Sequence, residues 1–300
     1  MLDLTVVIVN YRCWDTLSIC LESLKNQSVK IKKVIVVDNF SNDNKIDDFI
    51  DKFYWVDFIQ EQVNGGFSHG NNIGAKLAKT KWILFLNPDT EIPKNCFETL
   101  IKFCDNNSDF RLISIKQINK KGELTYPFGV FPNTLNVVPL FRSIERLFNR
   151  SQSKKIICKN DISFPNWISG SFILIRKEDF SKIGGWDESF WMYFEDVDLC
   201  KRADENLMKR VILNTWSCIH NHGGASRKNN EIKIKTKSEV IISSHKYVNK
   251  HFSGLNKLVA QILIIIQSAI ELVILSFFSK VKRGVFLNLI SYWIRIITIK

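Results

Sequence analysis

Residues 4–39 read LTVVIVNYRCWDTLSICLESLKNQSVKIKKVIVVDN, and this stretch decides the fold class. Two runs of mostly β-branched residues, Leu4–Val9 and Lys33–Val37, flank the segment Thr16–Leu24, which has the apolar spacing of a helix. A strand, a helix and a strand at this spacing predict a βαβ unit whose parallel strands are buried on both faces. We therefore expect an α/β fold with a Rossmann-like sheet and helices on both of its faces.

Polar residues follow these two strands at the point where each strand ends. Asn10 and Tyr11 close the first strand, and Asp38 and Asn39 close the second. Ligands of parallel sheets bind beyond the carboxyl ends of the strands. We therefore expect these four side chains to line a binding site.

A glycine-rich segment and a third apolar strand come next. Residues 64–74 read NGGFSHGNNIG and lead into a helix expected at 75–80, whose free N–H groups can approach a phosphate or a ribose. Turns also need glycine, so this segment is not specific by itself. The strand expected at 82–86 runs into the sequence NPD, in which Asp89 is placed to hold a divalent cation against a diphosphate. An ordinary turn aspartate is the competing interpretation.

Three carboxylates in the middle of the chain are candidates for acid–base chemistry. Residues 184–202 read GGWDESFWMYFEDVDLCKR, so a run of aromatic residues precedes Glu195, Asp196 and Asp198 at the start of a helix expected at 197–207. Acidic residues at a helix start also complement the helix dipole without any further role. Aromatic faces beside a carboxylate suit a sugar pocket, where burial raises the pKa of the carboxylate and makes it a better base.

Weaker patterns fill the remainder of residues 1–226. We expect an insertion poor in regular structure at 119–165 and a strand at 167–176, in which Gly170 marks a close approach. The other elements expected are helices at 93–103 and 178–183 and strands at 111–118, 210–213 and 216–219. His220 and His222 come directly after the last of these strands.

Charge and cysteine content limit the class of protein. The chain has a formal net charge of +12, but residues 227–300 hold thirteen Lys and Arg against three Glu, so the basic excess lies in this last quarter. The basic residues there alternate with apolar helical runs and not with stacking aromatic residues, which argues against a nucleic-acid binder. The seven cysteines show no C-x-x-C spacing, which is typical of buried, reduced thiols in a cytosolic protein.

Two apolar stretches lie in the basic last quarter. Leu258–Phe278 is long enough to cross a bilayer, but it contains Glu271, and a charge is costly at mid-membrane. A second stretch, at 285–299, follows the basic segment 280–283. We expect helices that lie in the interface of the cytoplasmic membrane, with the basic residues at anionic lipid headgroups. The alternative is a pair of helices packed on the rest of the chain or in a homodimer.

Seven motifs in one order resemble family 2 glycosyltransferases of the GT-A fold, and within that family the bacterial rhamnosyltransferase-like branch. The motifs are VVIVNY, VIVVDNFSND, NGGFSHGNNIGA, LFLNPDTEI, SGSFILIRKEDF, GGWDESFWMYFEDVDLCKR and HNHGGAS. The resemblance covers residues 4–226. The domain organisation we expect is a GT-A domain at 1–226, with a nucleotide-sugar half at about 1–115 and an acceptor half at about 116–226. We expect a basic, apolar helical extension in contact with the membrane at 227–300.

The resemblance implies a role for each residue that matches the family pattern. Asp196 would be the catalytic base, with Glu195 and Asp198 orienting it or the acceptor. Asp89 would hold Mg²⁺ or Mn²⁺ on the diphosphate, together with His220 or His222, of which the spacing from 195–196 favours His220. The residues implied to bind the nucleotide sugar are Asn10, Tyr11, Asp38, Asn39, Asn64, Gly65, Gly66, Phe67, Asn71, Asn72, Asp89 and Gly170.

Two positions depart from the family pattern. The metal motif is Asn-Pro-Asp in place of Asp-x-Asp, which leaves Asp89 as its single carboxylate. The glycine common in the turn after the catalytic helix is Asn206, a residue that also tolerates positive φ.

The activity implied is a metal-dependent, inverting transfer of a sugar in the synthesis of a cell-surface polysaccharide. The expected donor is dTDP-L-rhamnose, and the expected acceptor is a glycan or a polyprenyl-linked saccharide at the inner face of the membrane. Inversion needs a base for the acceptor hydroxyl and a neutralised diphosphate leaving group, and the carboxylates and cation site answer those needs. The alternatives are a different nucleotide sugar, or a non-catalytic, membrane-associated sugar-binding or scaffold protein on the same fold.

Overall fold

The computed structural model of the chain describes residues 1–125, 127–148, 161–221 and 229–298, and it divides into two compact units. The sheet unit comprises Met1–Phe131, Ser153–Glu188 and Glu195–Ala225. The helical unit comprises Pro132–Gln152, Ser189–Phe194 and Ser226–Lys300. No sequence signal indicated that residues 189–194 belong with the C-terminal helices. The division of residues 1–226 into nucleotide-sugar and acceptor halves stays a prediction.

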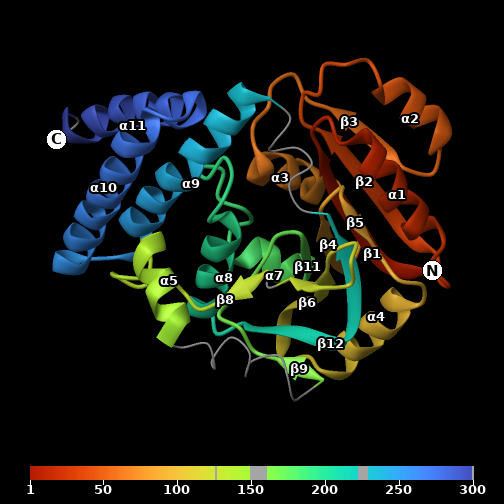
Figure 1. The fold of residues 1–300 in the computed structure, drawn as a ribbon. Helices are drawn as coiled ribbons and strands as arrows, with labels where there is room; N and C mark the ends of the chain where they lie inside the picture. Colours follow the sequence, from red (N-terminus) through yellow and green to blue (C-terminus); the bar gives the residue numbers. More distant parts are fainter. Residues whose placement is uncertain (126, 149–160, 222–228, 299–300) are drawn as a thin grey trace. The chain divides into compact units, whose positions relative to one another are not determined.

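The sheet unit is built on a ten-stranded mixed sheet with the order β3-β2-β1-β4-β11-β6-β12-β5, to which β7 and β9 attach at β6 and β12 (Figure 1). Strand β1 pairs in parallel with β2 and β4, whereas β11 runs antiparallel to β4 and β6. The strands are β1 (Leu2–Asn10), β2 (Ile31–Asp38), β3 (Asp57–Gln60), β4 (Trp82–Leu86), β5 (Thr90–Glu91), β6 (Phe110–Ile118), β7 (Leu124–Thr125), β9 (Ile162–Ser163), β11 (Phe172–Arg176) and β12 (Lys209–His220).

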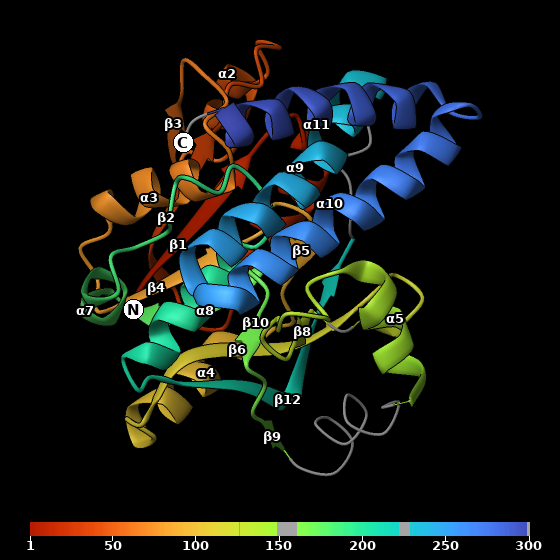
Figure 2. The same cartoon turned by 90° about the vertical axis from the view of Figure 1, so that its left-hand side faces the viewer.

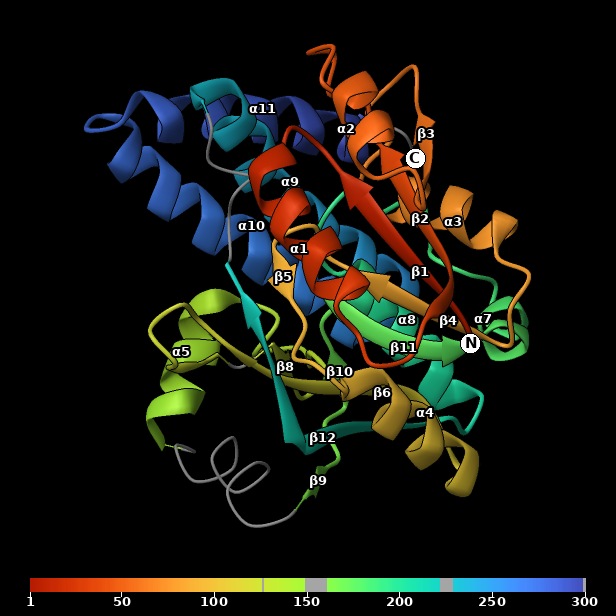
Figure 3. The same cartoon turned by 90° about the vertical axis from the view of Figure 1, so that its right-hand side faces the viewer.

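Helices cover both faces of this sheet because successive side chains of a buried strand point to opposite faces. In β4, Leu84 belongs to the core with α1, α2 and α4, whereas its neighbour Phe85 belongs to the core with α3, α7 and α8. Figure 3 shows α1 and α4 against the first of these faces. The helices are α1 (Trp14–Lys25), α2 (Ile46–Lys52), α3 (Phe67–Leu77), α4 (Cys96–Asn106), α7 (Lys177–Lys182) and α8 (Glu195–Glu205). The expected α/β fold is confirmed.

Several elements differ from those expected. The strand expected at 167–176 is two strands, β10 (Trp167–Ile168), which pairs with β8 (Phe128–Gly129), and β11, with a turn at Gly170 between them. The two short strands expected at 210–219 are the single strand β12, which shifts register on β6 between Leu213 and Ser217. The residue with positive φ after α8 is Leu207 and not Asn206.

The glycine-rich segment is mostly helix and not loop. Helix α3 begins at Phe67, so Gly70 and Gly74 lie within it and not before it. A Cβ at Gly70 would lie 2.8 Å from Val9 Cγ1, and one at Gly74 would lie 2.3 Å from Val7 Cγ1. These two glycines therefore let α3 pack closely on β1, and only Gly65 and Gly66 remain in the loop.

The six described cysteines are buried and form no disulfide with one another. Burial raises the pKa of Cys20, Cys96, Cys104, Cys200 and Cys218 to about 12. These thiols are therefore protonated and unreactive near neutral pH, which agrees with the role expected from their spacing.

The helical unit consists of α5 (Pro139–Phe148), α9 (Asn230–His251), α10 (Gly254–Ser276) and α11 (Lys280–Thr298). Figure 2 shows α9, α10 and α11 side by side. His245 of α9 is fully buried, with Nδ1 bonded to Gln261 Oε1 of α10 and Nε2 accepting from Trp293 Nε1 of α11 at 3.1 Å. Burial lowers the pKa of His245, which keeps the ring neutral at its two partners.

Helix α10 buries one side in this unit and exposes the other. Its fully or nearly buried residues recur every fourth position, at Ala260, Ile264, Ser268 and Leu272. Five apolar residues on the other side of the helix, here called the α10 stripe, are each between 45% and 59% exposed: Leu258, Ile262, Ile266, Ile270 and Ile274. By length and composition α10 is the one described helix that could cross a membrane. Its Glu271 pairs with Lys282 at 2.5 Å.

We expect Gly74→Ala to destabilise the sheet unit. The added Cβ would meet Val7 at 2.3 Å, so α3 or β1 must shift, and overpacking of this kind costs about 1–3 kcal/mol. At an exposed helical position the same change would stabilise by about 0.5–1 kcal/mol. Urea unfolding followed by circular dichroism measures the difference.

Lys76→Ala, at an exposed position of the same helix, is the control and should change the free energy of unfolding by less than about 0.5 kcal/mol. In a Val7→Ala background the steric contact is gone, so Gly74→Ala should cost less there than in the wild type. A Gly74→Ala variant as stable as the wild type would contradict the close packing of α3 on β1.

Candidate functional site

The carboxyl ends of β1 and β2 are joined by buried side chains. Asn10 and Asp38 are register partners, and Asn10 Nδ2 donates to Asp38 Oδ1 at 2.9 Å. Asp38 also accepts from the backbone N–H of Ser41 at 3.0 Å. Both Asn10 and Asp38 are fully buried, whereas Tyr11 is half-buried with the Arg12 guanidinium 5.4 Å from its ring. Asn10 and Asp38 thus fix the loop in which Tyr11 is presented.

Asn39 ties the end of β2 to the loop before α3. Its Nδ2 donates to Asn64 Oδ1 at 3.1 Å and to the Gly66 carbonyl at 3.0 Å, and its Oδ1 accepts from Gly65 N at 3.1 Å. Gly66 has a φ of 91°, which favours glycine. No side chain in the described part of the chain caps the N-terminus of α3. The first N–H groups of this eleven-residue helix are therefore available to an anion.

The two asparagines of α3 are engaged within the protein. Asn71 Nδ2 donates to the Phe67 carbonyl at 3.0 Å. Asn72 exchanges hydrogen bonds with the Trp186 backbone at 2.9 and 3.0 Å and donates to Glu188 at 2.8 Å. Asn72 therefore holds α3 against residues 186–188, and a role for either asparagine in lining a nucleotide pocket stays a prediction.

His69 and Glu188 are neighbours of this contact that the sequence did not single out. His69 Nδ1 lies 2.7 Å from Glu188 Oε2, and this contact raises the pKa of His69. The ring of Phe67 packs edge-on against Trp186 with centroids 5.3 Å apart. A Cβ at Gly170 would lie 3.0 Å from the same Phe67 ring, so the close approach expected at Gly170 is made by an aromatic side chain.

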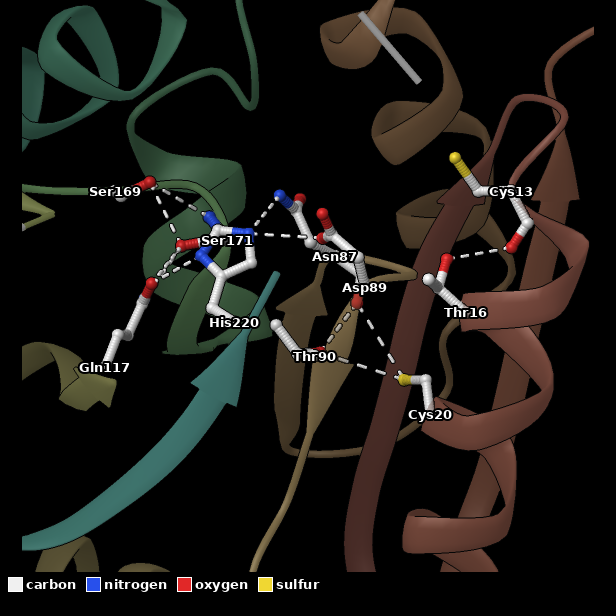
Figure 4. A network of polar contacts seen from close by, with 10 residues as sticks. All are labelled: Cys13, Thr16, Cys20, Asn87, Asp89, Thr90, Gln117, Ser169, Ser171 and His220. Atoms are coloured by element: carbon white, nitrogen blue, oxygen red, sulfur yellow. Dashed lines mark hydrogen bonds and ion pairs between the residues drawn. The ribbon is translucent and has the colours of Figure 1, made fainter. Parts of the chain in front are cut away.

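Asp89 and His220 meet at the end of β12 (Figure 4). His220 pairs in register with Thr90, which brings its Nε2 to 3.1 Å from Asp89 Oδ1 and 3.3 Å from Asn87 Nδ2. His220 is 2% exposed and Asp89 is 9% exposed. His222, the alternative ligand, lies outside the described residues.

This pair fits a divalent cation, although no group of three His, Cys, Asp or Glu side chains gathers among the described residues. A carboxylate oxygen and an imidazole nitrogen are two ligands, and diphosphate oxygens and water would supply the others. Gln117 Oε1 lies 2.7 Å from His220 Nδ1, which leaves Nε2 as the nitrogen that faces Asp89.

Hydrogen bonds continue from this pair toward Asp196. Gln117 Nε2 donates to Ser171 Oγ at 2.7 Å, and Ser171 Oγ lies 3.1 Å from Ser169 Oγ (Figure 4). The turn formed by these serines presents the N–H of Gly170 to Asp196 Oδ2 at 3.2 Å. Gln117, Ser169 and Ser171 therefore connect the two ends of the site. Sequence reasoning missed all three, because each is a short polar residue beside an apolar strand.

Glu195 and Asp196 form a pair of partly desolvated carboxylates at the start of α8. Glu195 is 8% exposed, and its buried Oε2 has no hydrogen-bond partner among the described residues. Burial, with the charge of Asp196 beside it, raises the pKa of Glu195 well above the usual value. Burial also raises the pKa of Asp196, although N–H donation from Gly170 and Val197 opposes this. These are the properties of a general base.

Asp198 is held by a different partner. It is fully buried, and Arg202 Nε donates to its Oδ2 at 2.8 Å while Arg202 Nη1 donates to the Ile183 carbonyl. An ion pair between residues one turn apart on α8 stabilises the helix and its packing. The contact of Asp198 with Arg202 is therefore a structural one. Its predicted role in orienting Asp196 or the acceptor stays a prediction.

The sequence profile of glycosyl transferase family 2 matches residues 5–184, which is more than half of the chain. The protein belongs to glycosyl transferase family 2. The residues matched include the carboxyl ends of β1 and β2, the loop before α3 and the Asn-Pro-Asp segment. The α/β sheet just described is the GT-A type of fold expected from the motifs.

Curated relatives of this chain include two rhamnosyltransferases and a beta-glucosyltransferase. Rhamnosyltransferase WbbL of Escherichia coli is 29% identical over 72% of this chain and 82% of its own length. The poly(ribitol-phosphate) beta-glucosyltransferase of Bacillus spizizenii is 31% identical over 79% of this chain and 43% of its own length. A 54-residue segment is 53% identical to the N-acetylglucosaminyl-diphospho-decaprenol L-rhamnosyltransferase of Mycobacterium tuberculosis, but covers 18% of each chain.

Solved structures share the fold at low identity. S. aureus TarS 1–349 in complex with UDP-GlcNAc has a TM-score of 0.55 at 17% identity, over 88% of this chain and 70% of that one. GalNAc-T7 with UDP, GalNAc and Mn²⁺ has a TM-score of 0.57 at 16% identity, over 83% of this chain and 50% of that one. At these identities the likeness establishes the fold alone.

We expect Arg202→Met to cost about 3–5 kcal/mol of folding stability, because Asp198 would stay buried without the guanidinium. Lys201→Met is the matched control on the same helix. Lys201 Nζ lies 4.0 Å from the exposed Glu205 carboxylate, and such a surface pair contributes about 0–1 kcal/mol. Thermal unfolding of the two variants gives the comparison. Equal losses of stability would contradict the buried ion pair.

Proposed function

We propose that this protein is a metal-dependent, inverting transferase that moves L-rhamnose from dTDP-L-rhamnose to a saccharide carried on a polyprenyl diphosphate. The observation that carries the proposal is one hydrogen-bonded network with Asp89 and His220 at one end and Asp196 at the other. The names of two relatives, both rhamnosyltransferases, support the choice of sugar.

Asp196 is the base in this proposal. It takes the proton of the acceptor hydroxyl as that oxygen forms a bond to the anomeric carbon and the bond from that carbon to the diphosphate breaks. The raised pKa of Asp196 makes its ionised form a stronger base than an exposed carboxylate. The N–H groups of Gly170 and Val197 hold the two oxygens of the carboxylate in place for this step.

Asp89 and His220 would hold the divalent cation in this proposal, with Gln117 orienting the imidazole. When bound, the cation neutralises charge that develops on the departing diphosphate. Tyr11, Asp38 and Asn39 take the base and the ribose, and the uncapped N-terminus of α3 attracts the diphosphate. The ion would be Mg²⁺ or Mn²⁺.

A transferase for a different nucleotide sugar is the second candidate. The relatives include a hexosyltransferase of Haloferax volcanii and the beta-glucosyltransferase of Bacillus spizizenii, and the TarS complex contains UDP-GlcNAc. A non-catalytic sugar-binding or scaffold protein has less support, because both the candidate base and the candidate cation ligands stand in a connected site.

The helical unit is placed, in this proposal, at the inner face of the cytoplasmic membrane. The α10 stripe is apolar over several helical turns, and Lys257, Lys280 and Arg283 lie at the ends of α10 and the start of α11. An apolar stripe with basic residues at its borders is typical of a helix that lies in an anionic lipid interface. Glu271 supports an interfacial position over a spanning one, because its side chain is 46% exposed in the pair with Lys282 and a charge is costly at mid-membrane.

We expect Asp196→Asn to abolish sugar transfer and to leave the affinity for dTDP-L-rhamnose and Mn²⁺ nearly unchanged. The amide keeps the shape of the carboxylate but cannot accept the proton. Asp89→Ala should instead weaken donor binding in the presence of Mn²⁺, because it removes a cation ligand. Radiolabelled transfer and calorimetric titration measure the two quantities. Interchanged phenotypes would contradict the roles assigned to these residues.

We expect the full-length protein to sediment with vesicles that contain phosphatidylglycerol, and to be partly released at high salt because screening weakens attraction to the basic residues. Replacing Ile262, Ile266 and Ile270 together by Ser should lower vesicle binding at every salt concentration. Replacing the exposed Tyr54, Val63 and Leu207 of the sheet unit by Ser is the control. A different result would contradict membrane binding. If the wild type forms dimers and binds no vesicles, and these dimers dissociate in the Ile variant, the α10 stripe is an interface with a second copy of the chain.

A further inference from the structure

Two aromatic residues directly before the acid pair have strained backbones. Tyr193 has a φ of 70° and Phe194 a φ of 65°. Bulky side chains rarely adopt this left-handed conformation, and it persists only where surrounding contacts hold it. Glu195 follows Phe194 by one peptide bond and is the first residue of α8. Any change in the backbone at 193–194 is therefore passed on to Glu195 and Asp196.

The contacts that hold this segment come from helix α9 of the same unit. Ser243 Oγ donates to the Met192 carbonyl at 3.0 Å, one residue before the strained pair. The ring of Tyr247, one turn further along α9, lies 5.5 Å from the ring of Phe194. The Lys235 ammonium lies 3.8 Å from the centre of the Trp191 ring. Ser243 and Tyr247 are almost fully buried, so their two contacts lie in the interior of the helical unit, whereas Lys235 is exposed.

The start of the segment is held by the same side of α9. Lys246 Nζ donates to the Ser189 carbonyl at 2.5 Å, and Lys250 lies 5.9 Å from the centre of the Phe190 ring. Phe190 is fully buried, so its ring does not offer a free face to a sugar, in contrast to the pocket expected from the aromatic run. The opposite side of α9 carries His245, which is bonded to α10 and α11. Helix α9 therefore lies between the segment and the rest of the helical unit.

Ser243 is distinguished from the other serines of α9 by what it contacts. Ser244 Oγ donates to the Ile241 carbonyl at 2.7 Å and Ser238 Oγ to the Ile234 carbonyl at 2.8 Å, both within α9 itself. Of these three serines, Ser243 is the one whose hydroxyl bonds to the segment before the acid pair. A buried hydroxyl that bonds a carbonyl of another segment fixes the position of that segment.

We propose that α9 is a positioning element of the active site, in which Ser243, Tyr247 and Lys235 hold Ser189–Phe194 in its strained conformation and thereby set the position of Glu195 and Asp196. The C-terminal helices are then part of the catalytic machinery and not only an anchor. This inference rests on the proposed role of Asp196 as the base. Ser243 is a positioning residue, because it acts through the Met192 carbonyl.

The test compares full-length Ser243→Ala with full-length Ser244→Ala. In Ser243→Ala, kcat should fall by about 10- to 100-fold, because small displacements of a catalytic group have effects of this size. The KM for the donor and the donor affinity with Mn²⁺ should stay within about twofold, because no donor contact is removed. Hydrogen–deuterium exchange at residues 189–198 should become faster. Ser244→Ala should resemble the wild type in every one of these measurements.

A second pair of variants keeps the test decisive if Ser243→Ala fails to fold. Lys235→Met removes the cation above Trp191, whereas Lys237→Met, two residues along the same helix and also exposed, is its control. Lys235→Met should lower kcat and speed exchange at 189–198, and Lys237→Met should do neither. In a Tyr193→Asn background, the loss caused by Ser243→Ala should be smaller, because asparagine tolerates the left-handed conformation.

The outcomes separate this inference from the proposed function. A wild-type protein that transfers no sugar would contradict the proposed function. Hydrogen–deuterium exchange that is faster in Ser243→Ala and not in Ser244→Ala would still show that α9 holds the segment Ser189–Phe194. An active wild type in which Ser243→Ala and Ser244→Ala have the same kcat and the same exchange at 189–198 would overturn the inference. A fall in donor affinity as large as the fall in kcat would also overturn it, because the change would then not be confined to the acid pair.

Discussion

Burial of the central parallel strands on both faces is the constraint on which the geometry of the site depends. In β1, β2 and β4 almost every buried interior position is apolar, because helices cover each face of the sheet. The buried Thr5 of β1 is an exception, and its hydroxyl is bonded to that of Thr80 at 2.7 Å. The other buried polar side chains lie where these strands end, at Asn10, Asp38 and the Asn-Pro-Asp segment. The strands therefore gather the polar residues at one edge of the sheet without any direct attraction between those residues.

The second constraint is the cost of burying the acid pair and the cation ligands. An isolated buried carboxylate is unfavourable, so Asp196 is stabilised by N–H groups of Gly170 and Val197 at the start of a helix. Asp89 is compensated by His220, which is in turn fixed by Gln117. Because the turn at Gly170 is also bonded to Gln117 through Ser171, the two ends share one support. A change at this turn should therefore affect both the base and the cation site.

The sequence predicted the elements whose side chains repeat with a clear period. The runs at β1, β2 and β4, the acidic start of α8 and the order of the motifs all depend on local pattern, and the fold and family follow from them. Helix α2 and strand β3 were missed, because α2 buries only Ile46 along its length and β3 is four residues long and partly exposed. The start of α3 was misplaced, because a glycine can serve a loop or a close helix packing and the sequence does not separate the two.

Residues whose partners are far away in the sequence could not be predicted. The pairing of Gln117 with His220 spans 103 positions, and the contact of Ser243 with Met192 spans 51. Neither carries a periodic or compositional signal. Asp198 illustrates the same limit at short range, because an acidic residue in the first turn of a helix can serve chemistry, the helix dipole or an ion pair. The pattern alone does not show that Arg202 Nε donates to this carboxylate.

The central claim is that Asp89 and His220 bind a nucleotide sugar through a divalent cation. Thermal unfolding of the purified full-length protein with a panel of nucleotide sugars, each with Mn²⁺ and with a chelator, tests it most directly. A ligand at a hundred times its dissociation constant adds about 2.7 kcal/mol of stability. The account predicts clear stabilisation by dTDP-L-rhamnose with Mn²⁺, lost with the chelator and in Asp89→Ala. A protein that no nucleotide sugar stabilises, or that is stabilised equally without the cation, would contradict it.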